Sequence, residues 1–197
     1  MTYDKETFQF YADNAAQYAN RREKISKTLP TFLGRLQKGV RVLELGSGAG
    51  LEAAYMLDQG FDILATEGNP ELGKYAHERL GERLKIMRFD QLTATHEFDG
   101  IWANMCLLHA PWDALDEIIG KIHGALKPDG LLMASFKSGN GAQRDHLDRY
   151  YNLPTQEALE AKFQNAAPWK NLELTKGEGG IGFDNKPYDV LWVSART

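Results

Sequence analysis

The hydrophobic pattern of the chain alternates between short apolar runs and segments in which apolar residues recur at helical spacing. The apolar runs are VRVLEL (40–45), FDILAT (61–66), LKIMRF (84–89), FDGIWANM (98–105) and LLMASF (131–136). Helical segments follow at 51–60, from Asn69-Pro70 to about 81, and from Pro111 to about 126. Strand followed by helix, repeated in this way, predicts right-handed βαβ units and a parallel sheet covered on both faces.

The two ends of the chain have different patterns. The spacing of Phe8, Tyr11 and Ala15 predicts one helix over 4–22, and a second helix is expected from about 26 to 37. Near the other end we expect a helix over 155–166. LELTK (172–176) and YDVLWVSA (188–195) then form an antiparallel hairpin across a glycine-rich connection, 177–182. Lys127-Pro128-Asp129-Gly130 has the composition of a turn.

The predicted fold class is therefore α/β: a Rossmann-like, doubly wound, seven-stranded and mostly parallel sheet with an antiparallel terminal hairpin. One domain is the expectation at this length. It divides into an N-terminal helical lid (1–38), a cofactor-binding core (39–136) and a substrate-side loop, helix and hairpin (137–197).

Composition excludes several classes of protein. The 197 residues carry 23 Lys and Arg against 27 Asp and Glu, a formal net charge of −4, which is a poor match for a nucleic-acid backbone. Cys106 is the single cysteine, so neither an internal disulfide nor a cysteine-based zinc cage can form. The five histidines show no ligand spacing, and we expect no metal. We find no signal peptide and no membrane span, which favours a cytoplasmic protein, as a monomer or homodimer.

Residues that could carry chemistry follow successive predicted strands. The loop Glu44-Leu45-Gly46-Ser47-Gly48-Ala49-Gly50 joins the first strand to a helix, where glycines permit a tight turn and close approach of a ligand to the backbone. Glu67, Asp90 and Asn104-Met105 follow the second, third and fourth strands. The carboxyl ends of parallel strands form the ligand crevice of open α/β sheets. Each feature taken alone is also compatible with packing or helix capping.

These segments resemble the motifs of the class I S-adenosylmethionine-dependent methyltransferases. The resemblance is carried by VLELGSGAG, ATEGNP, RFDQL, FDGIWANMCLLH and LKPDGLLMASF. Within that superfamily, FYADNAAQYA and FKSGNGAQRDHLDRYYN resemble small bacterial enzymes grouped with tellurite-resistance-type methyltransferases. The sequence Asn-Met-Cys-Leu after the fourth strand departs from the Asn/Asp-Pro-Pro-Tyr run of enzymes that methylate DNA adenine or protein glutamine, which disfavours those acceptors.

The resemblance implies S-adenosylmethionine as cofactor and assigns its contacts by segment. Gly46, Ser47, Gly48 and Gly50 would wrap the methionine part, and Glu44 would hold the loop and the cofactor's amino end. Glu67 would bind the ribose hydroxyls, with Gly68 and Asn69 nearby. Asp90 would accept a hydrogen bond from adenine, flanked by Gln91 and Leu92, while Asn104 and Met105 would lie near the amino acid and the sulfonium.

The acceptor side is predicted from topology. His109, just beyond the fourth strand, is a candidate general base, although capping or packing under the next helix explains it equally well. The 137–153 loop offers Lys137, Arg144, Tyr150 and Tyr151 as acceptor-binding residues, and a solvated polar loop is the alternative. Tyr11 and Tyr18, in the first predicted helix, would either form a lid over the cofactor or serve only to pack that helix.

Together these features predict a methyltransferase that passes a methyl group from S-adenosylmethionine to a small-molecule acceptor by in-line displacement. Two alternatives stay open. One is a cofactor-binding protein without transferase activity. The other is an NAD(P)-dependent oxidoreductase, which shares the strand–glycine loop–helix start. Its fingerprint is Gly-x-Gly-x-x-Gly rather than the Gly-x-Gly-x-Gly found here, and the chain has no Tyr-x-x-x-Lys pair.

Overall fold

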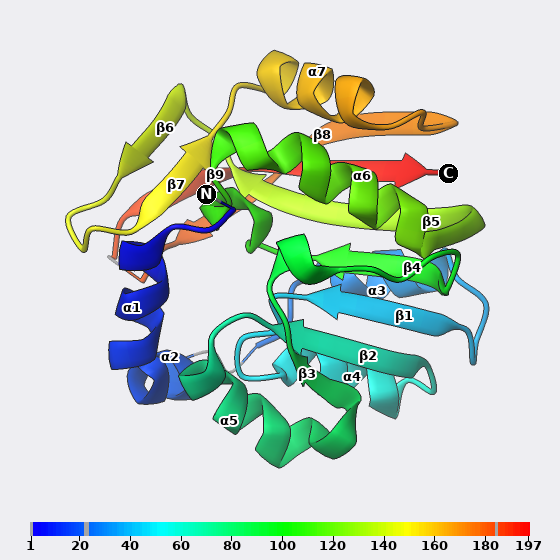
Figure 1. Cartoon of the computed structure of the whole chain (residues 1–197), viewed down its shortest axis with the longest axis horizontal. Coiled ribbons are helices and arrows are strands. Elements are labelled where there is room, and N and C mark those ends of the chain that lie inside the picture. The colour runs from blue at the N-terminus through cyan, green and yellow to red at the C-terminus, as the bar shows by residue number, and fades with distance from the viewer. Residues whose placement is uncertain (1, 22–23, 184) are drawn as a thin grey trace.

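A seven-stranded sheet runs through the centre of the computed structural model, which describes residues 2–21, 24–183 and 185–197 (Figure 1). Its strand order is β3-β2-β1-β4-β5-β9-β8, and β6 and β7 form a separate two-stranded sheet. The strands are β1 (Arg41–Leu45), β2 (Asp62–Glu67), β3 (Leu84–Ile86), β4 (Phe98–Ala103), β5 (Leu126–Lys137), β6 (Gly141–Arg144), β7 (Tyr150–Leu153), β8 (Asn171–Ile181) and β9 (Pro187–Arg196).

The first five strands are parallel, and the last two of the main sheet are antiparallel. β1 lies between β2 and β4, both parallel to it, whereas β9 pairs antiparallel with both β5 and β8. The predicted fold class is confirmed. The strand order reverses between β1 and β4, and a crevice at such a switch point is where open α/β sheets bind ligands.

Helices cover both faces of the sheet. They are α1 (Lys5–Asp13), α2 (Ala15–Arg21), α3 (Leu29–Gly34), α4 (Leu51–Asp58), α5 (Pro70–Leu80), α6 (Leu115–Ala125) and α7 (Gln156–Ala166), with short 3-10 turns at Gly81–Arg83, Phe89–Gln91, Leu107–His109 and Trp112–Ala114. One buried cluster joins the sheet to α6 and α7, and a second joins it to α3, α4 and α5. This burial on both faces explains why the strands are largely apolar rather than strictly alternating. The remaining pair, α1 and α2, lies beyond the carboxyl ends of β1 and β2 (Figure 1).

The N-terminal helices are shorter than the sequence predicts. The helix expected over 4–22 is broken at Asn14, whose side-chain amide donates to the carbonyl of Phe10 and so ends α1; Arg22 lies outside the described residues. The helix expected over 26–37 is α3, which begins at Leu29. The backbone N–H of Ser26 is instead bonded to the Glu52 carboxylate at 2.8 Å, which holds Ser26 outside the helix.

Three predicted connections are also wrong. Residues 127–130 are a bulge inside β5, because Phe98 pairs with Leu126 while Gly100 pairs with Leu131. The loop predicted over 137–153 contains the β6–β7 hairpin. Most of the expected connection 177–182 belongs to β8, where glycines make room for aromatic rings of β9: a Cβ at Gly177 would lie 2.5 Å from the Trp192 ring.

No helix within 2–21, 24–183 and 185–197 is long and apolar enough to cross a membrane. Clusters of three or more potential metal ligands are likewise absent from these residues.

Candidate functional site

Two adjoining cavities open at the carboxyl edge of the parallel strands. The smaller, of about 120 Å³, lies over the glycine loop and reaches Glu67 and Asp90. The larger, of about 880 Å³, extends toward β5 and the β8–β9 hairpin. Four side chains line both cavities: Tyr11, Tyr18, Met105 and His109. These four residues therefore form a shared wall between the two spaces.

The glycine loop has the backbone geometry of a ligand cradle. Gly46, Gly48 and Gly50 have φ angles of 63°, 58° and 78°, in the left-handed region where a side chain is strained. At Gly46 a Cβ would also lie 2.5 Å from the Cβ of Cys106. Of the loop, Gly46 and Gly48 face the smaller cavity. Glu44, Ser47 and Gly50 are buried beneath it, and the Ser47 hydroxyl has no hydrogen bond within the described residues.

Glu67 is buried at the end of β2 and ties the glycine loop to α5. Its carboxylate accepts the backbone N–H groups of Gly48 and Asn69, each at 2.9 Å. Burial raises the pKa of this carboxyl to about 7, against the lowering effect of those N–H groups. Asn69 in turn is the N-cap of α5, accepting from the N–H groups of Glu71 and Leu72. Glu67, Gly68 and Asn69 all line the smaller cavity, as the ribose prediction requires.

Asp90 lies at the far end of the smaller cavity, under the N-terminal segment. Its carboxylate accepts the hydroxyl of Thr2 at 2.8 Å and pairs with the guanidinium of Arg88 at 3.0 Å. These partners lower the pKa of the Asp90 carboxyl despite partial burial. The two residues predicted to flank adenine do not line this cavity. Gln91 is exposed and accepts the N–H of Arg88, and Leu92 is buried in the core beneath β4.

A buried hydrogen-bond network holds the end of β4. Glu52, 2% exposed, accepts the indole N–H of Trp102 at 2.7 Å and the side-chain amide of Asn104 at 3.1 Å. Asn104 then accepts the hydroxyl of Ser135, and that hydroxyl accepts the backbone N–H of Met105. Asn104 therefore lines the larger cavity rather than the smaller one.

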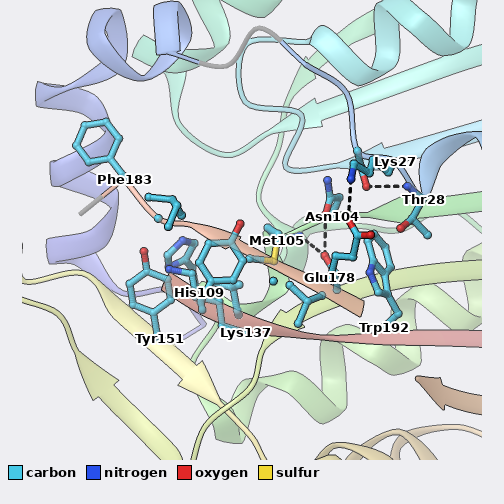
Figure 2. A pocket seen from close by; sticks show the side chains of 18 of the residues that line it. Lys27, Thr28, Asn104, Met105, His109, Lys137, Tyr151, Glu178, Phe183 and Trp192 are labelled. Atoms are coloured by element: carbon cyan, nitrogen blue, oxygen red, sulfur yellow. Dashed lines mark hydrogen bonds and ion pairs between the residues drawn. The ribbon is translucent and has the colours of Figure 1, made fainter. Parts of the chain in front are cut away.

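Met105 occupies a strained position on the shared wall. Its φ of 55° is unusual for a residue other than glycine. The network just described fixes its backbone, and its side chain lines both cavities. Figure 2 shows Met105 among the residues that line one of them.

His109 is fixed in one tautomer by two partners. Its Nδ1 lies 2.7 Å from the carbonyl oxygen of Tyr150, which can only accept, so Nδ1 carries the proton. Nε2 therefore accepts from the hydroxyl of Tyr11 at 2.9 Å. Loss of hydration lowers the pKa of the imidazole to about 4, with further lowering by the charges of Arg149 and Lys137. At neutral pH the ring is uncharged, and its Nε2 lone pair, on the shared wall, is bonded to the Tyr11 hydroxyl.

The predicted acceptor-binding residues are only partly brought together. Lys137 and Tyr151 line the larger cavity. Arg144 lies outside both cavities, on the surface of β6, where it forms ion pairs with Asp4 and Glu6 of the α1 end. The hydroxyl of Tyr150 also lies outside them, bonded to Asn152, so its contribution is the carbonyl that holds His109.

Several lining residues were missed by the sequence analysis as site residues. Phe183, which reaches the cavity from the β8–β9 hairpin, is one of them. Arg149, an arginine of the predicted 137–153 loop, also lines the cavity, and two hydrogen bonds from its guanidinium to Asp145 hold it in place. Trp192 is buried among the core residues and also lines the larger cavity. The presence of an apolar Phe183 within a glycine-rich connection is the one local signal that could have pointed to a contact.

Comparison with known proteins agrees with this geometry. Residues 18–167 match the family model described as a methyltransferase domain. A protein-L-isoaspartate O-methyltransferase from Bradyrhizobium sp. (strain BTAi1) is 29% identical over 156 residues, which is 71% of this chain and 66% of the relative, just under two thirds of its length.

Solved structures share the fold over almost the whole chain. A 1,6-didemethyltoxoflavin-N1-methyltransferase from Burkholderia thailandensis, solved with 1,6-didemethyltoxoflavin and S-adenosylhomocysteine, has a TM-score of 0.72 at 24% identity, covering 96% of this chain and 85% of that one. A TehB-like S-adenosylmethionine-dependent methyltransferase from Corynebacterium glutamicum has a TM-score of 0.67 at 22% identity, covering 98% of both chains.

The sheet order, the glycine loop and the acidic strand ends thus define a class I S-adenosylmethionine-dependent methyltransferase fold. The chain belongs to the methyltransferase domain family. The sequence left two classes of cofactor open. Membership of this family decides in favour of S-adenosylmethionine and against a nicotinamide dinucleotide.

Proposed function

We propose that this methyltransferase transfers its methyl group to a small-molecule acceptor held in the larger cavity. The observation that carries the proposal is the wall shared by the two cavities. A cavity of about 880 Å³ is within the range that holds small organic ligands, roughly 300–1,000 Å³, and it meets the cofactor side at four side chains. No added recognition domain is needed to bring an acceptor to that wall.

The residues of the smaller cavity fit the cofactor. The glycine backbone and the carboxylates of Glu67 and Asp90 line this cavity, and the buried Ser47 hydroxyl lies beneath it without a hydrogen bond within the described residues. Together they offer donors and acceptors for the cofactor's amino acid, ribose and adenine. When bound, S-adenosylmethionine supplies an electrophilic methyl group on a positively charged sulfur. The cavity of about 120 Å³ is smaller than typical ligand pockets. We therefore propose that this structure corresponds to a closed form, from which the segment bearing Thr2 and Tyr11 moves outward when the cofactor binds.

His109 is proposed as the base for acceptors that must lose a proton. Its imidazole is neutral, correctly tautomerised and placed on the shared wall. A pKa of about 4 makes it a weak base, so it suits acceptors that are themselves acidic. Tyr11 and Tyr18, on α1 and α2, close the same wall from the lid side.

The test measures transfer of labelled methyl groups from S-adenosylmethionine to a panel of small thiols, amines, phenols and carboxylic acids, with an isoaspartyl peptide as rival acceptor because of the Bradyrhizobium relative. We expect label in at least one small molecule. His109→Gln should lower its turnover by a factor of about 10²–10⁴ and leave S-adenosylhomocysteine affinity unchanged. His77→Gln, at an exposed position on α5, is the matched control.

Label confined to the isoaspartyl peptide would replace the small-molecule proposal with a protein acceptor. Binding of S-adenosylhomocysteine without transfer to any member of the panel would refute the proposal as stated. Full activity in His109→Gln would remove His109 from the chemistry while leaving the acceptor class intact.

A further inference from the structure

The charge of the larger cavity is opposite to that of the chain. The whole sequence has a formal net charge of −4. Among the described residues that line the cavity, in contrast, five are cationic and one is acidic; they are Arg21, Lys24, Lys27, Lys137, Arg149 and Glu178. Cationic side chains concentrated in a cleft focus the potential there and attract anions.

The charges are unevenly distributed along the cavity. Lys27 and Glu178 form an ion pair at 2.7 Å at one end, close to Thr28 and Trp192, and so neutralise each other (Figure 2). At the other end, beside His109, the charged lining residues are Lys137 and Arg149, and Arg149 is paired with Asp145 at 2.6 Å behind the lining. Both charged lining residues next to the wall where methyl transfer is proposed are therefore cationic.

Lys137 and Arg149 are arranged around one ring. The ammonium of Lys137 lies 4.3 Å from the centroid of the Tyr151 ring, and the guanidinium of Arg149 lies 5.2 Å from it. Arg149 is 2% exposed and is fixed by Asp145, so its charge is immobile. The Tyr151 ring itself lies 4.6 Å from His109. The two cationic groups are thus held around the Tyr151 ring, which itself lies next to the proposed base, His109.

The same cavity is lined by flat aromatic surfaces. Tyr18 and Phe183 are stacked with ring centroids 6.1 Å apart and an interplanar angle of 28°, and Tyr188 and Trp192 line the β9 side. Aromatic faces favour contact with planar unsaturated groups through offset stacking. A small inorganic anion would leave most of a space of about 880 Å³ unfilled.

Resting on the function proposed above, we infer that the acceptor is a planar, unsaturated organic acid. Its carboxylate or phosphate group binds beside Lys137 and the edge of Arg149, and its ring lies among Tyr18, Phe183 and Tyr188. The acid group is recognised by charge and the ring by stacking, so removing either property weakens binding. Anion binding also places a negative charge beside His109, which counteracts the smaller effect that the charges of Arg149 and Lys137 add to that of burial.

The experiment uses the full chain with S-adenosylmethionine and three planar acids with different acceptor atoms: para-hydroxybenzoate, para-aminobenzoate and para-mercaptobenzoate. Each is compared with its neutral methyl ester and with the corresponding non-planar cyclohexane acid. For at least one acid we expect kcat/KM to exceed that of both matched compounds by about tenfold or more. Lys137→Gln should raise KM for the acid by about tenfold and leave KM for the ester unchanged. Lys170→Gln, an exposed position paired with Asp129 at the opposite edge, is the matched control.

The outcomes separate the two proposals. Equal or better use of the methyl esters, or of the cyclohexane acids, would overturn the acceptor class while leaving small-molecule methyl transfer in place. The same conclusion follows if none of the acids is methylated but a thiol or amine of the general panel is. If Lys137→Gln raises KM equally for the acid and for the ester, the lysine only supports the fold of the cavity. If no compound of either panel is methylated, both proposals fail.

Discussion

The raised pKa of Glu67 makes cofactor binding depend on pH in a way that can be calculated. The proposed ribose contact needs the ionised carboxylate as acceptor, whereas burial raises the pKa of this carboxyl to about 7 in the closed form. At pH values one unit below this pKa, only about one copy in ten is ionised, and binding must first remove a proton. The dissociation constant for S-adenosylhomocysteine should therefore fall by about tenfold, or about 1.4 kcal/mol, between pH 6 and pH 8.

The stability of the folded protein changes with pH in the opposite direction to its cofactor affinity. A carboxyl whose pKa rises from 4.5 to about 7 on folding stabilises the folded state fully below pH of about 4.5. That contribution, on the order of 3 kcal/mol, is lost as the pH rises through about 7. The ligand-free protein should thus lose stability over the same range in which its cofactor affinity increases.

Calorimetry with S-adenosylhomocysteine at several pH values, in buffers of different ionisation enthalpy, measures both the affinity and the proton released. Glu67→Gln should bind more weakly at pH 8 and show no slope, while Glu71→Gln, an exposed carboxylate on the first turn of α5, should keep the slope of the parent chain. A flat profile in the parent chain, or an equal slope in Glu67→Gln, would refute the reasoning.

Three further changes test other parts of the site. Gly46→Ala should destabilise the fold by about 1–3 kcal/mol and weaken cofactor binding, since its Cβ would lie 2.5 Å from that of Cys106; an unchanged urea midpoint would contradict the tight contact. Glu52→Ala should cost about 3 kcal/mol in urea unfolding, because the Trp102 indole N–H loses its buried acceptor; a loss below about 1 kcal/mol would show that the network contributes little. Arg144→Ala should change stability by less than about 1 kcal/mol but accelerate S-adenosylhomocysteine association in stopped flow, as α1 loses its ion pairs to β6; an unchanged rate would mean that those pairs do not hold the lid closed.

The sequence is most informative where burial on both faces dictates its pattern. β1 and β4 are largely apolar, so their strand type could be predicted, and the polar residues that follow successive strands could be placed on one edge of the sheet. Glu67 and Asp90 do meet at the smaller cavity as expected. Their contacts with the cofactor remain predictions.

Features that depend on tertiary contacts left no such pattern. All four residues of β6 are exposed, so nothing in their hydrophobicity marks a strand. Arg149 is buried because Asp145 and three rings surround it, and a local sequence gives no indication of those rings. The break at Asn14 is a competition between a side-chain amide and the helix backbone, which apolar spacing does not reveal.

The β6–β7 hairpin contributes residues to the site although it is not part of the main sheet. It forms its own two-stranded sheet, apart from the seven strands that carry the fold, yet it supplies Tyr151 and the Tyr150 carbonyl that orients His109. Exchanging this short segment, from the end of β5 to the start of α7, should alter what the enzyme modifies while leaving the parallel strands and the glycine loop in place. New acceptor preferences could accordingly evolve by small insertions and replacements here, at little cost to the scaffold.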